Sequence, residues 1–311
     1  MTSRFQRLAD FTRSDIRRAL ASGLLEMELG PFNMQLKGQH AVLIDFLFDA
    51  YRDAPVRTSI GEVADVSIHV RAPNIFRRFI RPQVIPDPGF IVPAVPLPQR
   101  LSPLALEMGL NLAIALKICR FVTFHSAVVA NDKGAIMVNA KSGGGKSTLA
   151  SALMQTGYRL LSDEFGLLNM ADASLMPYPR PVSLKEKSID IVRDMVGDDW
   201  LTPKMTGTPK GDIAYYRARP SDIAAAHTPA LCKLMLFPRF SEGATAQARA
   251  LPKSETMMRL IPSSTNYHLL GAGSFKALAD MVAGAEAYEI IYGNTEDSLK
   301  LVSSLATGAG L

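Results

Sequence analysis

The chain has 311 residues, more than a single domain usually contains, so one large or two unequal domains are expected. Hydrophobic residues make up 48% of the chain and charged residues 20%, a composition that allows a substantial core and excludes a disordered protein. The net charge of +5 suits acidic partners such as nucleotide phosphates. However, the sequence lacks the dense lysine and arginine run of a nucleic-acid-binding protein, so no nucleic acid partner is expected.

Neither a membrane nor an oxidising compartment is indicated. The first residues contain no apolar core of signal-peptide length, and the longest apolar stretches are shorter than the ~20 residues that span a bilayer. Cys119 and Cys232 lie far apart in apolar surroundings, which favours buried free thiols over a disulfide or a metal site. We therefore expect a cytoplasmic protein with no membrane partner.

The first hundred residues read as a small α+β domain. Short helices are predicted over residues 14–23 and 40–52, and alternating apolar residues predict strands within 24–36 and 63–70. The basic, aromatic-containing segment 71–82 is interpreted as a solvated hairpin rim, with a docking surface for an acidic or phosphorylated partner as the alternative.

A proline-rich segment follows and sets the expected domain boundary. Residues 82–98 contain six prolines among apolar residues, which excludes an ordinary helix or central strand and predicts an extended connector. The chain is therefore divided into an N-terminal α+β domain with its connector, residues 1–100, and a second domain, residues 101–311. A strongly apolar helix from Ser102 to about Ile118 opens the second domain.

A phosphate-binding loop is the most informative motif of the sequence. A strand over 121–130, a turn at 131–134 and a strand over 135–140 lead into three glycines, after which a helix runs from Lys146 to about Gln155. Glycines let backbone N–H groups turn towards an anion, and the start of a helix adds free N–H groups and a positive dipole end. The predicted nucleotide-binding residues are Ser142, Gly143, Gly144, Gly145, Lys146, Ser147 and Thr148.

Within this loop, Lys146 is expected to reach the β- and γ-phosphates of a nucleotide, and the Ser147 hydroxyl is expected to hold Mg²⁺. The motif departs from G-x-x-x-x-G-K-[ST] at one position, because Ala140 stands where the first glycine is expected. Alanine is small enough to be tolerated there. The alternative is a glycine- and serine-rich loop with an incidental lysine.

An acidic pair ends the strand predicted over 158–163. Asp163 could help to hold Mg²⁺ or accept the proton of an attacking hydroxyl, and Glu164 could assist in binding the metal. The predicted metal ligands are thus Ser147, Asp163 and Glu164. The alternative for either carboxylate is a helix cap or an ion pair.

Two more residues are candidates for catalysis. His125 lies within the strand predicted next to the loop, and it is either a catalytic neighbour or a core histidine. Phosphoryl transfer also needs cations around the γ-phosphate. Arg180 lies between two prolines in a rigid segment, so it either points into the site or sits on a surface turn; Lys185, Lys210 and Arg217 are weaker candidates.

Taken together, the histidine strand, the hairpin, the Gly-Lys-Ser loop and the Arg-Leu-x-x-Asp-acidic segment resemble the catalytic domain of HPr kinase/phosphorylase. The fold is distantly shared with phosphoenolpyruvate carboxykinase. The chain is most similar to the HPr-kinase-related kinases of bacterial peptide-modification clusters, the HprK-related kinase A group, including lasso-peptide precursor kinases. The matching segments are 179–185, 208–211, 264–267 and 288–293, and the resemblance covers about residues 100–305.

The resemblance implies an α/β fold, with a P-loop catalytic domain built on a mixed sheet, and a kinase that uses ATP and Mg²⁺. By position, Asp163 would be the base for a serine hydroxyl on a peptide or small protein, Glu164 a supporting acid and His125 an active-site neighbour. Homo-oligomers occur among such kinases. Thr148 replaces the glutamate that is common there, and the segment linked to reverse phosphorolysis is missing, so neither phosphorylase activity nor HPr as substrate is expected.

Two other functions stay open. The first is a small-molecule kinase or a phosphotransferase like phosphoenolpyruvate carboxykinase. The second is a switch or chaperone that binds ATP and hydrolyses it slowly without transferring phosphate. The acidic pair so soon after the loop and the hairpin before it favour the kinase.

Overall fold

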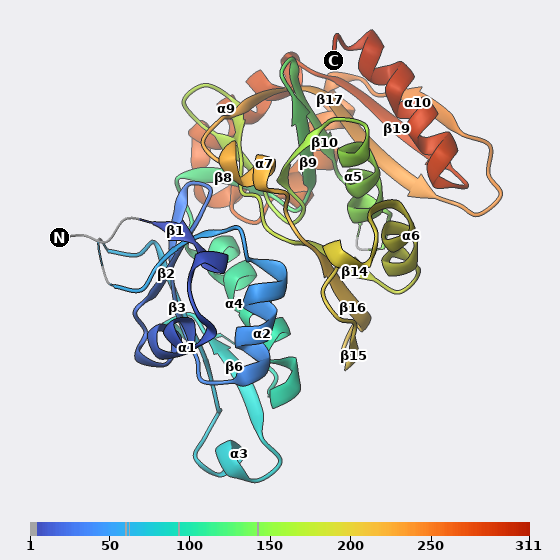
Figure 1. Ribbon diagram of the computed structural model, residues 1–311. Helices are drawn as coiled ribbons and strands as arrows, with labels where there is room; N and C mark the ends of the chain where they lie inside the picture. The colour runs from blue at the N-terminus through green and yellow to red at the C-terminus, as the bar shows by residue number, and fades with distance from the viewer. Residues whose placement is uncertain (1–4, 60, 62, 93, 142) are drawn as a thin grey trace. The chain divides into compact units, whose positions relative to one another are not determined.

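The computed structural model describes residues 5–59, 61, 63–92, 94–141 and 143–311. Contacts between residues divide the chain into two compact units, Met1–Ile118 with Thr202–Asp212, and Cys119–Leu201 with Ile213–Leu311 (Figure 1). The contacts place the helix that begins at Ser102 in the first unit, whereas the boundary predicted near residue 100 places it in the second. The reason is that this helix packs against two strands of the first unit.

The first unit is a seven-stranded sheet with helices packed on it. Its strand order is β1 (Gln6–Arg7), β4 (Pro55–Arg57), β2 (Leu25–Leu29), β3 (Phe32–Lys37), β5 (Val66–Arg71), β6 (Gln83–Asp87) and β7 (Leu97–Pro98). The helices are α1 (Arg13–Ser22), α2 (Ala41–Ala50), α3 (Phe76–Phe79) and α4 (Ser102–Lys117). β3 and β5 pair in parallel, whereas the other strand pairs described in this sheet are antiparallel.

The proline-rich segment contains more strand than predicted. β6 pairs with β5 along one edge, and on the other edge β7 pairs only with Gln83 and Val84. Among the described residues, Pro86 therefore lies in a part of β6 that pairs with β5 alone. A proline is tolerated at such a position because no second strand needs its missing N–H.

The basic segment between β5 and β6 forms the end of an antiparallel hairpin, as expected for residues 71–82. Four apolar side chains on it, those of Ile75, Phe76, Phe79 and Ile80, are 63–71% exposed. The docking role considered for this segment stays a prediction.

The second unit is built on a mixed sheet. Its strand order is β11 (Arg159–Ser162), β9 (Ala127–Asn131), β10 (Gly134–Val138), β17 (Ala230–Phe240), β13 (Ser174–Met176), β12 (Gly166–Asn169) and β8 (Phe121–Phe124), while β19 (Glu286–Tyr292) pairs with β17 and with β18 (Gln247–Ala250). The pairs β10–β17 and β17–β19 are parallel and the others antiparallel, which agrees with the predicted mixed α/β sheet.

Helices cover both faces of this sheet (Figure 1). They are α5 (Lys146–Gln155), α6 (Lys187–Val196), α7 (Pro220–Ala224), α8 (Lys253–Leu260), α9 (Gly271–Ala283) and α10 (Thr295–Gly308). Alternate residues of β10 enter two different core clusters: Ile136 and Val138 pack with α5 and α10, and Ala135 and Met137 pack with α8 and α9. Burial on both faces explains why β10 is apolar without interruption.

Outside the main sheet, β14 (Val182–Lys185) pairs with residues 213–216 of β16 (Gly211–Tyr216). β15 (Met205–Thr208) lies in the segment assigned to the first unit.

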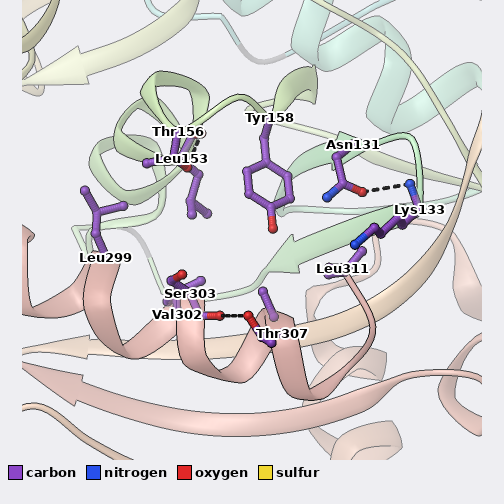
Figure 2. Close-up of a pocket in the computed structure, with 11 residues that line it drawn as sticks. Asn131, Lys133, Leu153, Thr156, Tyr158, Leu299, Val302, Ser303, Thr307 and Leu311 are labelled. Carbon is purple, nitrogen blue, oxygen red and sulfur yellow. Dashed lines mark hydrogen bonds between the residues drawn. The ribbon is translucent and has the colours of Figure 1, made fainter.

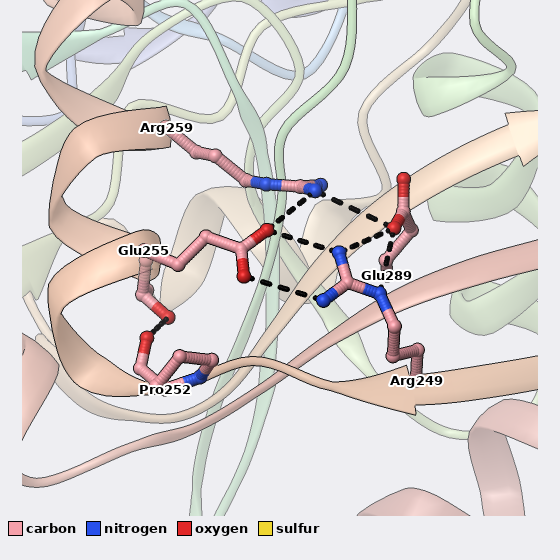
Figure 3. A network of polar contacts seen from close by, with 6 residues as sticks. Arg249, Pro252, Glu255, Arg259 and Glu289 are labelled. Carbon is pink, nitrogen blue, oxygen red and sulfur yellow. Dashed lines mark hydrogen bonds and ion pairs between the residues drawn. The ribbon is translucent and has the colours of Figure 1, made fainter.

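A surface ion network joins α8 to β18 and β19 (Figure 3). The Arg249 guanidinium lies 2.9 Å from the Glu255 carboxylate and 2.7 Å from that of Glu289, and Arg259 lies 2.8 Å from Glu255. These side chains are about a third to a half exposed, so water and salt screen the pairs and their contribution to stability is small.

The two cysteines differ. Cys232 is buried, as predicted, and burial raises the pKa of its thiol to about 12. Cys119 is exposed, so its predicted burial is wrong. It lies in the short connection between α4 and β8, where its apolar sequence neighbours can face the core while its own side chain faces solvent. No helix in the described part of the chain is long and apolar enough to cross a membrane.

Candidate functional site

The strand predicted over residues 121–130 is two strands. β8 pairs with β12, whereas β9 pairs with β10 and β11, and the chain changes partners at His125 and Ser126. The backbone N–H of His125 donates to the carbonyl of Ser263, 2.8 Å away, instead of to a strand of the sheet. His125 is therefore not within a strand as predicted but at a break between two.

The glycine loop connects β10 to α5, as the sequence predicts. Gly143 and Gly145 have φ angles of +81° and +85°, which residues with a Cβ rarely adopt. Gly145 is the N-cap of α5, and Thr148 lies in the first turn of the helix. Ser142, the remaining predicted loop residue, lies outside the described residues.

Position 144 needs a glycine because neighbouring atoms of the loop lie too close for a side chain. A Cβ at this position would lie 2.8 Å from the Cβ of Ala140 and 3.0 Å from the carbonyl oxygen of Lys141. Ala140, the departure from the usual motif, therefore packs directly against the loop.

Gly144→Ala is expected to distort the loop and to weaken nucleotide binding by roughly tenfold or more, since overpacking typically costs about 1–3 kcal/mol. Adding Ala140→Gly removes the Cβ–Cβ contact and should restore part of the affinity. Equilibrium binding of ATP to the wild type, the single variant and the double variant checks this, and equal affinity in all three would contradict it.

Lys146 is buried and lies over the loop. Its ammonium donates to the carbonyl oxygen of Ala140 at 2.5 Å, and the residue is 7% exposed. Burial lowers the pKa of Lys146, and the negative charges of Asp163 and Glu164 oppose this shift. A bound phosphate could replace the Ala140 carbonyl oxygen as the acceptor of the Lys146 ammonium.

Asp163 directly follows β11 and reaches the start of α5. Its Oδ2 accepts from the Ser147 hydroxyl at 3.0 Å and from the Ser183 N–H at 3.1 Å. Its Oδ1 is buried and has no hydrogen-bond partner among the described residues. Burial, and next the charge of Glu164, raise the pKa of Asp163 to about 7.

This raised pKa makes stability depend on pH. The free carboxyl ionises near 3.8, so the unfolded chain loses this proton at lower pH than the folded chain, and stability contributed by protonated Asp163 is lost as pH rises from about 4 to about 7. Asp163→Asn should therefore be more stable than the wild type by roughly 1–4 kcal/mol at pH 8 and by much less at pH 4.

Urea denaturation of the metal- and nucleotide-free protein at the two pH values measures this difference. Asp190→Asn, at an exposed site on α6, serves as the control and should follow the wild type. An advantage of Asp163→Asn that is equal at both pH values would contradict the expectation.

The pair Ser147–Asp163 fits a magnesium ion. Both are hard oxygen donors, and the unpaired Oδ1 of Asp163 is a buried acceptor that a cation would satisfy. Within the described residues, no cluster of three or more histidine, cysteine, aspartate or glutamate side chains could hold a metal. Mg²⁺ commonly has few protein ligands and completes its coordination with nucleotide oxygens and water, which is consistent with the two ligands Ser147 and Asp163.

Glu164 faces His125 rather than Ser147. The Nδ1 of His125 lies 3.2 Å from the Glu164 carbonyl oxygen and 3.6 Å from its carboxylate. Burial and the charge of Lys146 lower the pKa of His125, while Glu164 opposes the shift, so the surroundings favour the neutral imidazole. The structure thus brings His125, Lys146, Asp163 and Glu164 into one cluster, with Asp163 on the side of α5.

Arg180 is placed by contacts to Tyr178. Its guanidinium lies over the Tyr178 ring, 5.3 Å from the centroid, and donates to the phenol oxygen at 3.2 Å. The cation whose charge acts on both Lys146 and His125 is instead Lys185. Arg217, another candidate, stacks on Trp200.

Several residues of the site were not predicted from the sequence. The Ser183 N–H on Asp163 has no sequence signal, because any residue supplies a backbone N–H. Asn139 donates to Ser263 at 2.7 Å, joining the base of the loop to the segment that holds His125. Tyr292 lies close to Gly145, where a Cβ would come within 2.8 Å of its hydroxyl.

A separate pocket of roughly 270 Å³ lies at the C-terminal end of α5 (Figure 2). Tyr158 and Leu153 line it together with one face of α10, and Lys133 lies at the turn before β10. Its lining contains none of the predicted site residues. The phosphate loop and this pocket are therefore at opposite ends of the same helix.

Comparisons with known proteins give little further information. No family model matches the sequence, and no curated protein matches it. Among solved structures, the HPr(Ser) kinase/phosphatase from Coxiella burnetii is found with 14% identity over 60% of this chain and 98% of that chain, at a TM-score of 0.26. Similarity at this level supports no conclusion about activity, so the site is interpreted from its own residues.

Proposed function

We propose that the protein is a kinase that uses Mg²⁺ and ATP to phosphorylate a serine-type hydroxyl on a peptide or small protein. The observation that carries the proposal is the Asp163 carboxylate, whose Oδ2 accepts from the Ser147 hydroxyl and the Ser183 N–H. Its Oδ1 has no hydrogen-bond partner among the described residues, and burial raises its pKa to about 7. A carboxyl group that titrates near the working pH is suited to accept a proton.

In the proposed reaction, the acceptor oxygen bonds to the γ-phosphorus of ATP and the bond from that phosphorus to the β,γ-bridging oxygen breaks. The hydroxyl proton passes to Asp163, and ADP leaves. Lys146 and the N-terminal N–H groups of α5 would bind the donor phosphates and stabilise their charge. Bound Mg²⁺, held by Ser147 and Asp163, would neutralise phosphate charge in the transition state.

The resemblance to HPr-kinase-related kinases supports a serine on a peptide or small protein as the acceptor. The neutral imidazole of His125, half-exposed beside Glu164, is suited to contact an uncharged hydroxyl-bearing substrate. A cytoplasmic location and assembly into homo-oligomers belong to the same proposal.

Intact-mass analysis tests the proposal. The protein is mixed with Mg²⁺–ATP and short serine-containing peptides encoded beside its gene, and a peptide that gains one HPO₃ unit identifies acceptor and reaction together. The gain should be absent with Asp163→Asn. Phosphate release without transfer would favour an ATP-dependent switch, and transfer to a metabolite but to no peptide would favour a small-molecule kinase.

A further inference from the structure

The chain turns sharply between β14 and α6, immediately after Lys185. The Ser188 hydroxyl donates to the Lys185 carbonyl at 2.5 Å and accepts from the Lys185 N–H at 2.7 Å, so one side chain holds both backbone polar groups of Lys185. The next residue, Glu186, has a φ of +50°, which is rare for a residue with a Cβ. Strain of this kind persists where the surroundings impose it, often at ligand-binding sites.

β14 presents Lys185 on the side away from the core. Val182 and Leu184 are fully buried in the core cluster that contains residues of α5, while Ser183 and Lys185 are partly exposed. Alternate residues of a strand point to opposite faces, so Ser183 and Lys185 share the second face.

The same strand runs past the phosphate loop. The Ser183 N–H bonds to Asp163, and both β14 and α6 contact α5, which begins at Lys146. Lys185, two residues after Ser183, therefore lies on the same strand as the N–H group that binds Asp163.

Electrostatics agree with this placement. Burial is the main cause that lowers the pKa of Lys146 and of His125, and the positive charge of Lys185 adds a smaller lowering to each. In the described part of the chain, the Lys185 ammonium makes no hydrogen bond or ion pair. Two ammonium groups near one another repel, and an anion that binds between them removes this repulsion.

We propose that Lys185 binds the terminal phosphate of a nucleoside triphosphate, opposite Lys146, and thereby distinguishes the triphosphate from the diphosphate. Its role in transfer rests on the proposed kinase function, whereas its role in binding requires only that the loop holds a nucleotide. The rigid corner at Ser188 would fix the distance of the ammonium from the loop.

Equilibrium binding without an acceptor tests the proposal. Lys185→Met should raise the dissociation constant of a non-hydrolysable Mg²⁺–ATP analogue by roughly tenfold or more, as expected for loss of a charge-assisted contact, and that of Mg²⁺–ADP by less than about twofold. Lys187→Met removes an exposed lysine two residues away and should change neither constant. Lys185→Arg, which keeps the charge, should retain most of the preference for the triphosphate.

An equal loss of affinity for both nucleotides, or no loss, would overturn the proposal while leaving the kinase function intact. Conversely, a protein that transfers phosphate to no acceptor but loses triphosphate preference in Lys185→Met would contradict the kinase function and support the role of Lys185. A wild-type protein that binds neither nucleotide would contradict both the role of Lys185 and the kinase function.

Discussion

Asp163→Asn is expected to lower the rate of phosphoryl transfer by about 10²–10⁴-fold, the contribution typical of a general base. Asparagine has nearly the same shape and can still occupy the space between Ser147 and Ser183, but it cannot accept the hydroxyl proton. Single-turnover transfer measures the rate, and ATP affinity is measured separately to show that binding persists.

The matched control is Asp190→Asn, which removes an exposed carboxylate from α6 and should retain wild-type transfer. Raising the Mg²⁺ concentration separates two roles of Asp163. If the residue served only as a metal ligand, excess Mg²⁺ would recover the rate of Asp163→Asn. No recovery is expected if Asp163 is the base.

The dependence of kcat/KM on pH also tests the role of Asp163. Because burial raises the pKa of Asp163 to about 7, the carboxylate is ionised only above this pH, so kcat/KM of the wild type should rise with pH through about 7 and then level off. A profile that is flat from pH 5 to 9 would mean that ionisation of Asp163 does not control the reaction.

Lys146→Met is the second change with a large expected effect, a loss of about 10²–10³-fold in kcat/KM, as for removal of one preorganised donor that stabilises transition-state charge. Lys146 is buried and its pKa is lowered by burial, so replacing it with an apolar side chain of similar length should leave the melting temperature unchanged or higher. Activity should therefore fall without loss of the fold.

Lys276→Met, at an exposed position on α9 where the lysine pairs with Asp280, is the control. Its kcat/KM should equal that of the wild type. If Lys146→Met kept its activity, the phosphate-binding role of the loop lysine would be wrong, and with it the proposed function.

Local features were predicted well. The hairpin of β9 and β10, the glycine loop and helix α5 from Lys146 to Gln155 all lie where the sequence placed them, because apolar runs, glycines and helix propensity act over a few residues. Asp163 lies directly after β11, where the sequence placed it, and its Oδ2 accepts from Ser147; its catalytic role stays a prediction.

Features that depend on distant residues were not predictable. The strand break at His125 is imposed by Ser263, more than a hundred residues away, which takes the backbone N–H that a neighbouring strand would have used. Arg180 is 5% exposed, so of the two alternatives the surface turn is excluded, and its guanidinium lies over the Tyr178 ring; its role at the phosphates stays a prediction. Lys185 ranked low because its sequence neighbours do not reveal which face of β14 is buried.

The sequence by itself determined a glycine loop between a strand and a helix, a buried mixed sheet and an acidic residue after the next strand, since each of these is encoded by a short run of residues. That the loop binds phosphate stays a prediction. Only the tertiary structure decided how those groups act. Burial raises the pKa of Asp163, its orphaned oxygen creates a place for a cation, and the packing of β14 against α5 brings Lys185 towards Lys146. Desolvation and charge proximity are properties of three-dimensional packing, and no local sequence pattern specifies them.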